Sequence, residues 1–361
     1  MEDNVKDYGE VEARLSKTNI IKCDSCGSNM IYEPKRGVIY CEHCGASRKI
    51  KTVRTNERDF DYRPTNKVED GRQSFRCANC GAVTVFERGE IATTCPFCGA
   101  ANTQQIDEMP GITPTAIIPF AISKDDSKQF YLKWIKKRIF APRVLKKTFT
   151  VDKMSGVYIP CWTFDTNTVS RYEGRLGETY TVTVGTGKDS HTVTKVRWFR
   201  VSGIYERFFD DLTIEDSSYI SQKSFDKISP FNTNNANVFD ASFMAGFKAE
   251  RYRTGIDECF KKAQEVIQNT VRKAILNRYH ADKVDYLNVN TQYNDKKYKY
   301  VVVPTWICSY QYKAKPFNFF VNGQTGKTYG TYPKSPIKVG FAVLLGLIVL
   351  AGLIYYFLCG K

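Results

Sequence analysis

The hydrophobic pattern of the chain changes character along its length. Residues 20–103 contain only short apolar runs between charged and turn-forming residues, a pattern that predicts small hairpins. Residues 148–215 and 284–329 are rich in Val, Thr and Tyr, which predicts long antiparallel strands, with a Gly-rich turn at Val184–Gly187. Val339–Cys359 is a stretch of 21 residues without a charge.

Two helices are predicted by apolar residues that recur at intervals of three and four. In Asp125–Phe140 the apolar positions fall on one side of a helix and the lysines mainly on the other. This basic helix either packs on a sheet with a solvated face or rests its charged side on anionic lipid headgroups. A longer helix is predicted over Ile256–Tyr279, after a polar loop at 216–240, and Asp240 is placed to cap a helix that begins near Ala241.

The apolar stretch Val339–Cys359 predicts a transmembrane helix. It would be about 31 Å long, which matches the hydrocarbon layer of a bilayer. A buried core helix of this length is rarely apolar on every side, so we expect a single-pass C-terminal anchor in the cell membrane. Three lysines closely precede the stretch and one follows it, which predicts that residues 1–335 face the cytoplasm.

Eight of the twelve cysteines form four Cys-x-x-Cys pairs in two equally spaced halves. The first half contains Cys23, Cys26, Cys41 and Cys44, and the second contains Cys77, Cys80, Cys95 and Cys98. A shift of 54 residues places each cysteine of the first half on one of the second, and a glycine follows the second cysteine of every pair. This internal duplication predicts two four-cysteine metal sites.

The residue type and spacing favour zinc. Two thiolates three positions apart on a tight turn can bind one ion at about 2.3 Å, and Zn²⁺ suits a closed tetrahedron of four sulfurs. Tetrahedral iron is the alternative metal, and disulfides are a weaker alternative because no secretory signal precedes the pairs. His43 is interpreted as a bystander because four cysteines already fill the site. We expect two structural Zn²⁺ ions that stabilise modules too small to build a core.

These patterns divide the chain into six parts. The parts are a flexible N-terminus (1–19), zinc ribbon one (20–50), a linker (51–74), zinc ribbon two (75–103), an α+β domain with antiparallel sheets (111–332) and the transmembrane helix (339–359). Within the α+β domain, Tyr158–Trp162 resembles Val302–Trp306, which indicates an internal duplication of two helix-plus-strand units that share one core. The two tryptophans are interpreted as core residues, with the floor of a pocket as the alternative.

The charge of the chain favours anionic partners. The formal net charge is +15, and it would be about +11 with eight thiolates and two zinc ions. Anionic lipid and phosphate-rich molecules suit such a surface, although an ordinary basic surface is the alternative. The linker and the residues before it carry five bases, and a solvated tether or a phosphate contact would explain them. These bases are Arg48, Lys49, Lys51, Arg54 and Arg58.

No group of residues predicts catalysis. Asn322–Thr328 reads NGQTGKT, but Val321 stands where a phosphate-binding loop needs glycine and no helix follows, so a hairpin turn is predicted. Asp210 and Asp211 are interpreted as a pair of loop acids, with a functional carboxylate pair as the alternative. The chain contains three histidines, none in the sequence context of a Ser or Cys nucleophile, and we therefore expect no enzyme. Three single cysteines are interpreted as small buried apolar residues: Cys161, Cys259 and Cys308.

The chain from Phe75 onward resembles a group of bacterial membrane-anchored proteins called TFIIB-type zinc ribbon-containing proteins. The matching segments are Phe75–Gly99, Pro119-Phe120, Trp134, Tyr158–Asp165, Phe208–Asp211, Ala245–Phe247, Glu250–Tyr252, Pro304–Trp306 and Val321–Lys327. Some members of the group carry a primosomal or replication-helicase label, but this sequence lacks the ATP-binding motifs of a helicase. The resemblance implies work beside membrane-scaffold proteins of the SPFH type in envelope-stress systems.

The sequence therefore predicts a membrane-anchored cytoplasmic adaptor or scaffold that carries two zinc ribbons. Its expected partners are the lipid bilayer and membrane or membrane-associated proteins. The alternative is a nucleic-acid-binding protein that uses the ribbons and the basic linker at the membrane.

Overall fold

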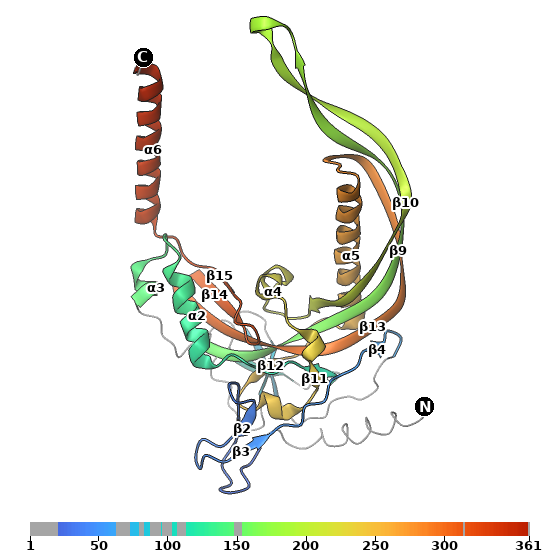
Figure 1. The fold of residues 1–361 in the computed structure, drawn as a ribbon. Helices are drawn as coiled ribbons and strands as arrows, with labels where there is room; N and C mark the ends of the chain where they lie inside the picture. The colour runs from blue at the N-terminus through green and yellow to red at the C-terminus, as the bar shows by residue number, and fades with distance from the viewer. Residues whose placement is uncertain are drawn as a thin grey trace.

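The computed structural model describes residues 21–62, 73–78, 83–86, 95, 103–106, 113–147, 154–312 and 315–359. Its centre is a large mixed sheet organised by three long curved strands, with a small N-terminal module at one end (Figure 1). The long strands are β9 (Met154–Val184), β10 (His191–Glu215) and β13 (Lys283–Tyr312). β9 lies between the other two and is antiparallel to both.

The length of these strands follows from their composition. They contain 31, 25 and 30 residues, rich in the β-branched and aromatic side chains that favour extended backbone. At about 3.3 Å per residue, β9 alone has a contour of roughly 100 Å. β9 and β10 continue beyond the end of β13 as a two-stranded arm, whose turn lies at the predicted Gly-rich position (Figure 1).

Shorter elements complete the fold. The short strands of the large sheet are β4 (Arg58–Asp59), β5 (Gln73–Cys77), β6 (Val83–Phe86), β7 (Thr103–Ile106), β8 (Ala116–Ile117), β11 (Asn237–Val238), β12 (Lys248–Glu250), β14 (Lys315–Asn322) and β15 (Thr328–Gly330). The α-helices are α2 (Lys124–Lys136), α3 (Arg143–Lys147), α4 (Gln222–Ile228), α5 (Ile256–Arg278) and α6 (Pro336–Cys359). Single 3₁₀ turns lie at Gly187–Asp189, Thr233–Asn235 and Ala241–Met244.

Two units of the sheet share one order of elements, β8–α2–β9–β10 and β12–α5–β13–β14. In each unit the helix begins eight residues after the start of the short strand. Each short strand pairs in parallel with the long strand of the other unit. Tyr158 lies opposite Pro304, and Pro160 lies opposite Val302. The two similar segments therefore pair symmetrically about the Ile159–Val303 pair. This arrangement agrees with two related units that share one core.

The helices follow the predicted pattern with three differences. α2 begins after Ser123, whose hydroxyl accepts the N–H of Asp126, and it buries Tyr131 and Trp134 against the sheet. The predicted apolar side also included Ile139, but this residue lies beyond the helix and is 77% exposed. The predicted loop at 216–240 contains α4. Asp240 does cap the next element, but that element is a 3₁₀ turn of four residues.

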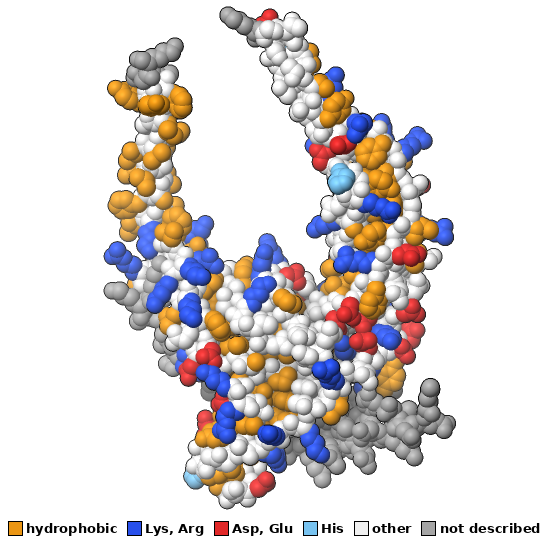
Figure 2. Space-filling view, in the orientation of Figure 1, with side chains coloured by type: hydrophobic (Ala, Val, Ile, Leu, Met, Phe, Trp, Pro, Cys, Tyr) orange, Lys and Arg blue, Asp and Glu red, His pale blue; other side chains and the backbone are white. Residues whose placement is uncertain are grey.

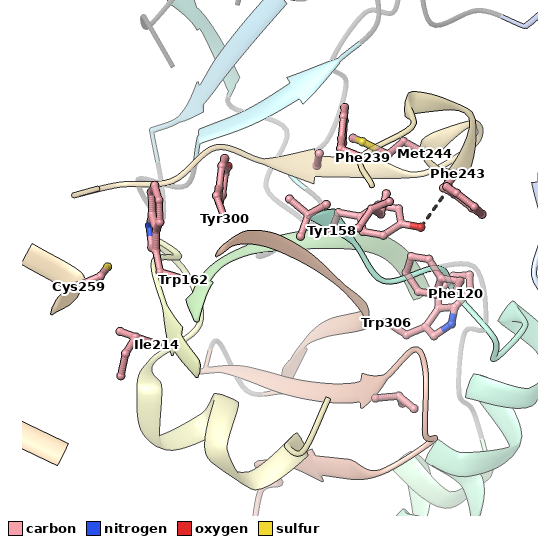
Figure 3. Packing of buried hydrophobic residues seen from close by; sticks show 14 of the residues in the cluster. Phe120, Tyr158, Trp162, Ile214, Phe239, Phe243, Met244, Cys259, Tyr300 and Trp306 are labelled. Carbon is pink, nitrogen blue, oxygen red and sulfur yellow. Dashed lines mark hydrogen bonds between the residues drawn. The ribbon is translucent and has the colours of Figure 1, made fainter. Parts of the chain in front are cut away.

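Aromatic side chains dominate the core between the two units (Figure 3). The Trp162 ring stacks on the Tyr300 ring with 4.8 Å between centroids, and its indole N–H donates to Asp216 at 3.1 Å. The Trp306 ring contacts that of Phe120 at 5.1 Å, and its N–H donates to a backbone carbonyl at 2.8 Å. Both indoles are at most 4% exposed. Their packing agrees with the core interpretation and leaves no pocket floor.

The first half of the predicted linker is part of the domain. β4 pairs with β13, and Phe60 is buried with its ring 4.6 Å from that of Phe260 and 6.3 Å from that of Phe164. Residues 51–62 are therefore not a solvated tether, because one aromatic anchor within a charged segment fixes them to the sheet. Residues 63–72 lie outside the described part of the chain.

The C-terminal apolar stretch forms α6, which projects from the body as a free-standing helix (Figure 1). Its segment Pro336–Phe357 has a mean hydropathy of 2.6, and none of it is buried inside the protein. Length, composition and exposure are consistent with a membrane anchor. The arm formed by β9 and β10 projects in the same general direction from the other side of the body (Figure 1).

Candidate metal centre

The N-terminal module is a three-stranded sheet that carries two matching turns. Its strands are β1 (Ile31–Glu33), β2 (Val38–Tyr40) and β3 (Ser47–Lys49). Gly27 and Gly45 have φ of +73° and +79°, and each N–H donates to the carbonyl of the first cysteine of its pair, at 2.8 and 2.9 Å. Residues with a Cβ rarely adopt this backbone, so the glycines permit the tight turns that present the thiols.

These turns bring together the four cysteines of the first predicted ribbon: Cys23, Cys26, Cys41 and Cys44. All four sulfurs lie within 4.8 Å of one another, and two sulfur pairs between the turns are 3.5 Å apart. A tetrahedron with metal–sulfur bonds of about 2.3 Å has sulfur–sulfur edges of roughly 3.8 Å. No disulfide joins the described cysteines. The four residues therefore fit a metal ion such as Zn²⁺.

The surroundings of the sulfurs suit a structural metal. Cys23 and Cys41 are buried beside Met30 and Ile39, whereas Cys26 is exposed. Hydrogen bonds from the side chain and backbone of Ser28 lower the pKa of Cys26 to about 6, which favours the thiolate. Four sulfurs complete the coordination of zinc, so such a site holds the module together and leaves no position for a substrate.

The second predicted site lies partly outside the described residues. Cys77 and Cys95 are described, and both are 2% exposed. Cys80 and Cys98 lie outside the described residues, so a second metal site stays a prediction. Among the described residues, a single four-cysteine group is present. The strands around Cys77 belong to the large sheet, because β6 pairs with both β5 and β12.

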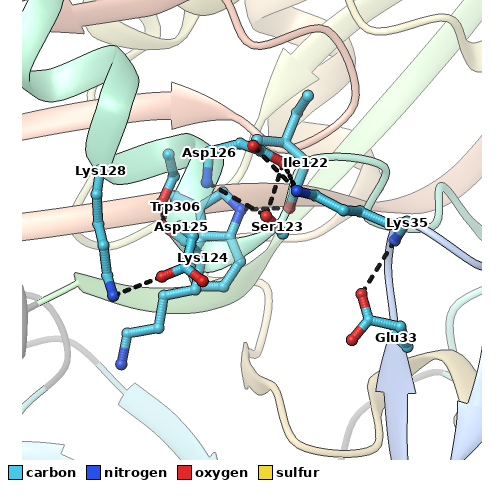
Figure 4. A network of polar contacts seen from close by, with 10 residues as sticks. Glu33, Lys35, Ile122, Ser123, Lys124, Asp125, Asp126, Lys128 and Trp306 are labelled. Carbon is cyan, nitrogen blue, oxygen red and sulfur yellow. Dashed lines mark hydrogen bonds and ion pairs between the residues drawn. The ribbon is translucent and has the colours of Figure 1, made fainter.

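The metal module is attached firmly to the sheet domain. The Tyr32 side chain is 4% exposed, and its ring meets that of Phe243 edge-on at 5.5 Å. Its hydroxyl donates to the carbonyl of Phe120 at 3.2 Å, and its backbone N–H donates to Ala245 at 3.0 Å. At the edge of this contact, the Lys35 ammonium lies 3.0 Å from Asp126 in the first turn of α2 (Figure 4). One tyrosine from the module thus completes the core of the domain.

Sequence reasoning missed a buried charged cluster. The Lys299 ammonium is 2.7 Å from a carboxylate oxygen of Asp211 and 3.3 Å from one of Glu57. Asp165 accepts the backbone N–H of Asp211 at 2.7 Å, and burial raises the pKa of Asp165 to about 7. The three carboxylates lie within reach of one ion, but the ammonium of Lys299 already supplies the positive charge. No sequence signal marks this cluster, because Glu57 and Lys299 are 242 positions apart.

Other residues considered for chemistry have structural roles. Asp211 is not a loop acid, because it lies at a bulge of β10 with φ of +47°. Asn322 begins the predicted hairpin turn, where its side-chain oxygen accepts the N–H groups of Gln324 and Thr325. The three single cysteines are fully buried, as predicted: Cys161, Cys259 and Cys308. Burial raises the pKa of Cys259 to about 12, which makes this thiol unreactive.

The fold and site define a chain with a four-cysteine module, a mixed α+β sheet domain and a long apolar C-terminal helix. The chain is 29% identical over 324 residues to the protein named "Uncharacterized protein YdjG" of Bacillus subtilis (strain 168), and the alignment covers 88% of this chain and 91% of that protein. No family model matches the chain. No solved structure matches it.

Proposed function

We propose that this protein is a membrane-anchored adaptor that presents zinc-ribbon modules at a fixed position beside the bilayer. The observation that carries this proposal is the insertion of Tyr32 into the core of the domain that continues into α6. A closed four-sulfur shell would shape a surface rather than bind a substrate. We place the body on the cytoplasmic side, because thiolate ligands need a reducing compartment and lysines precede the helix.

β10 offers a surface for a protein partner along the stretch where its partner strand β9 also pairs with β13. Its exposed residues there include Trp198, Ile204 and Phe208, which are 41%, 51% and 54% exposed. The guanidinium of Arg175 lies 5.5 Å from the centre of the Trp198 ring. Exposed aromatic and arginine side chains are enriched at the centres of protein interfaces. Together with the family resemblance, this composition supports a membrane-associated protein, such as an SPFH-type scaffold, as the partner class.

A crosslinking pull-down from native membranes tests the adaptor proposal. The full chain is compared with a Cys23→Ser/Cys26→Ser variant and with Cys259→Ala as a matched cysteine control. We expect one set of proteins to copurify with the full chain and the control and to be lost with the double variant. Identical partner sets for all three forms would refute a role of the module, and recovery of the full chain in the soluble fraction would refute the anchor.

Exposed bases near the module favour nucleic acid as a second candidate ligand. Arg48, Lys49, Lys51 and Arg54 are all exposed, and such a row could contact phosphate. The test is binding of labelled DNA and RNA to the full chain in detergent, measured across salt concentrations. A steep loss of affinity with salt would favour this candidate, and absence of binding at low salt would exclude it.

A further inference from the structure

The start of α6 is fixed to the body rather than joined by a loose linker. The backbone N–H of Ser335 donates to the carbonyl of Phe140 at 2.8 Å. One turn later, the Lys338 ammonium donates to the carbonyls of Ile139 and Ala141 at 3.0 and 2.7 Å. The segment between α2 and α3, residues 137–142, is therefore held against the first turn of α6; together with α3, we call it the α2–α3 corner.

Aromatic rings make this junction rigid. The guanidinium of Arg138 lies against two rings that also contact each other, 5.1 Å from the centre of Trp134 and 5.8 Å from that of Tyr332. Trp134 in turn contacts Phe319 of β14 at 5.0 Å, and Tyr310 donates its hydroxyl to the carbonyl of Thr331. The direction of α6 relative to the sheet is thus set by packing on both sides of the connection.

Large apolar side chains are exposed around the same junction. Ile139 is 77% exposed, Val144 on α3 is 62% exposed and Ile337 at the start of α6 is 71% exposed. Isolated exposed apolar residues are ordinary on a protein surface. These three lie within a few residues of the hydrogen bonds that join the α2–α3 corner to α6, where a membrane-spanning helix would enter the interface.

The charge around the junction is of one sign. No acidic residue occurs between Asp126 and Asp152, and none follows Asp295. Basic side chains gather at the base of α6 (Figure 2). In sequence, the bases of this region include Lys133, Lys136, Lys137, Arg138, Arg143, Lys334 and Lys338. An apolar tip surrounded by such bases is the composition of interfacial membrane-binding segments.

We propose that the α2–α3 corner and the first turn of α6 form a membrane-binding collar for anionic phospholipid headgroups. Ile139 and Val144 enter the headgroup layer, and Lys137 and Arg143 contact the phosphates. The collar fixes the angle between the body and the bilayer, because the same corner is hydrogen-bonded to α6. This inference rests on the anchoring in the proposed function and adds a second, charge-selective contact with the same membrane.

The test uses the full chain in lipid nanodiscs, either of phosphatidylcholine alone or with added phosphatidylglycerol. A photoreactive benzoylphenylalanine replaces Ile139, and the matched control places it at Val53, which is 60% exposed. Val53 lies in the segment between β3 and β4, which is away from α6 (Figure 1). We expect phospholipid crosslinks from position 139 but not from position 53, and more of them in the anionic discs. Lys137→Gln and Arg143→Gln should each reduce labelling in anionic discs by about fivefold.

Carbonate extraction of the same samples separates failure of this inference from failure of the anchor. If the chain resists extraction but position 139 labels no lipid, the collar is refuted and the anchor stands. Equal labelling in both kinds of disc would refute the selectivity for anionic headgroups. If the chain is extracted, the anchor in the proposed function is refuted, and the collar falls with it.

Discussion

The contact of Tyr32 with the sheet domain gives the sharpest test of the account. Tyr32→Ala removes a buried ring, which typically costs about 3–5 kcal/mol, and a hydrogen bond worth about 1 kcal/mol. The metal ligands lie outside this contact. The substitution should therefore weaken the docking of the module on the sheet domain and leave the metal site intact. Tyr32→Phe removes only the hydroxyl that donates to Phe120, so it should cost about 1 kcal/mol.

Hydrogen exchange of the full chain in detergent measures this docking directly. The N–H of Tyr32 donates to Ala245 across the contact, so its protection reports the docked state. We expect protection to fall at least about a hundredfold in Tyr32→Ala and only several-fold in Tyr32→Phe. Tyr40→Ala is the control, because Tyr40 is a half-buried tyrosine on the neighbouring strand of the module. Equal protection in Tyr32→Ala and the control would refute a docked module.

Three further predictions concern the buried charges and thiols. Asp165 has a pKa of about 7 in the folded chain and an ordinary value of 3.8, so the folded state retains a proton that the unfolded state loses. The free energy of unfolding should therefore fall as pH rises from about 4 to about 7, by on the order of 1 kcal/mol for each pKa unit between the unfolded and folded values. Asp165→Asn should flatten this fall in urea titrations at several pH values. An unchanged pH profile in the variant would show that Asp165 does not cause the fall. Lys299→Met leaves buried carboxylates uncompensated, so denaturant unfolding should show a loss of about 3–5 kcal/mol, whereas a neutral effect would show that the cluster is solvated. The three single buried cysteines are Cys161, Cys259 and Cys308. They should resist alkylation until the protein unfolds, as measured by mass spectrometry. Rapid labelling of the native chain would contradict their burial.

Local patterns in the sequence were sufficient for the elements that local chemistry determines. The spacing of Cys23 to Cys44, with its two glycines, predicted a four-sulfur group that the structure brings together. The resemblance of Tyr158–Trp162 to Val302–Trp306 predicted two related units, and these segments lie on adjacent strands. The uncharged stretch that begins at Val339 predicted the helix α6.

Features that depend on distant pairing could not be predicted in this way. Residues 51–62 look like a solvated linker because their charges outnumber their apolar residues, yet Phe60 finds a place between two strands and a helix. The Lys299 cluster joins acids from three separate segments, and no periodicity marks them. The burial of Tyr32 likewise comes from the neighbouring domain, which no pattern within its own ribbon marks.

The account depends most on the metal in the first module, so metal content is the measurement that tests it most directly. Elemental analysis of the full chain, purified without oxygen, should find at least one tightly bound zinc per chain. Cys23→Ser should lower the content by one zinc per chain, whereas Cys259→Ala should leave it unchanged. Replacement by Co²⁺ should give the absorption of a tetrahedral thiolate site. A chain that contains no metal, or whose metal content is the same in Cys23→Ser, would contradict the account.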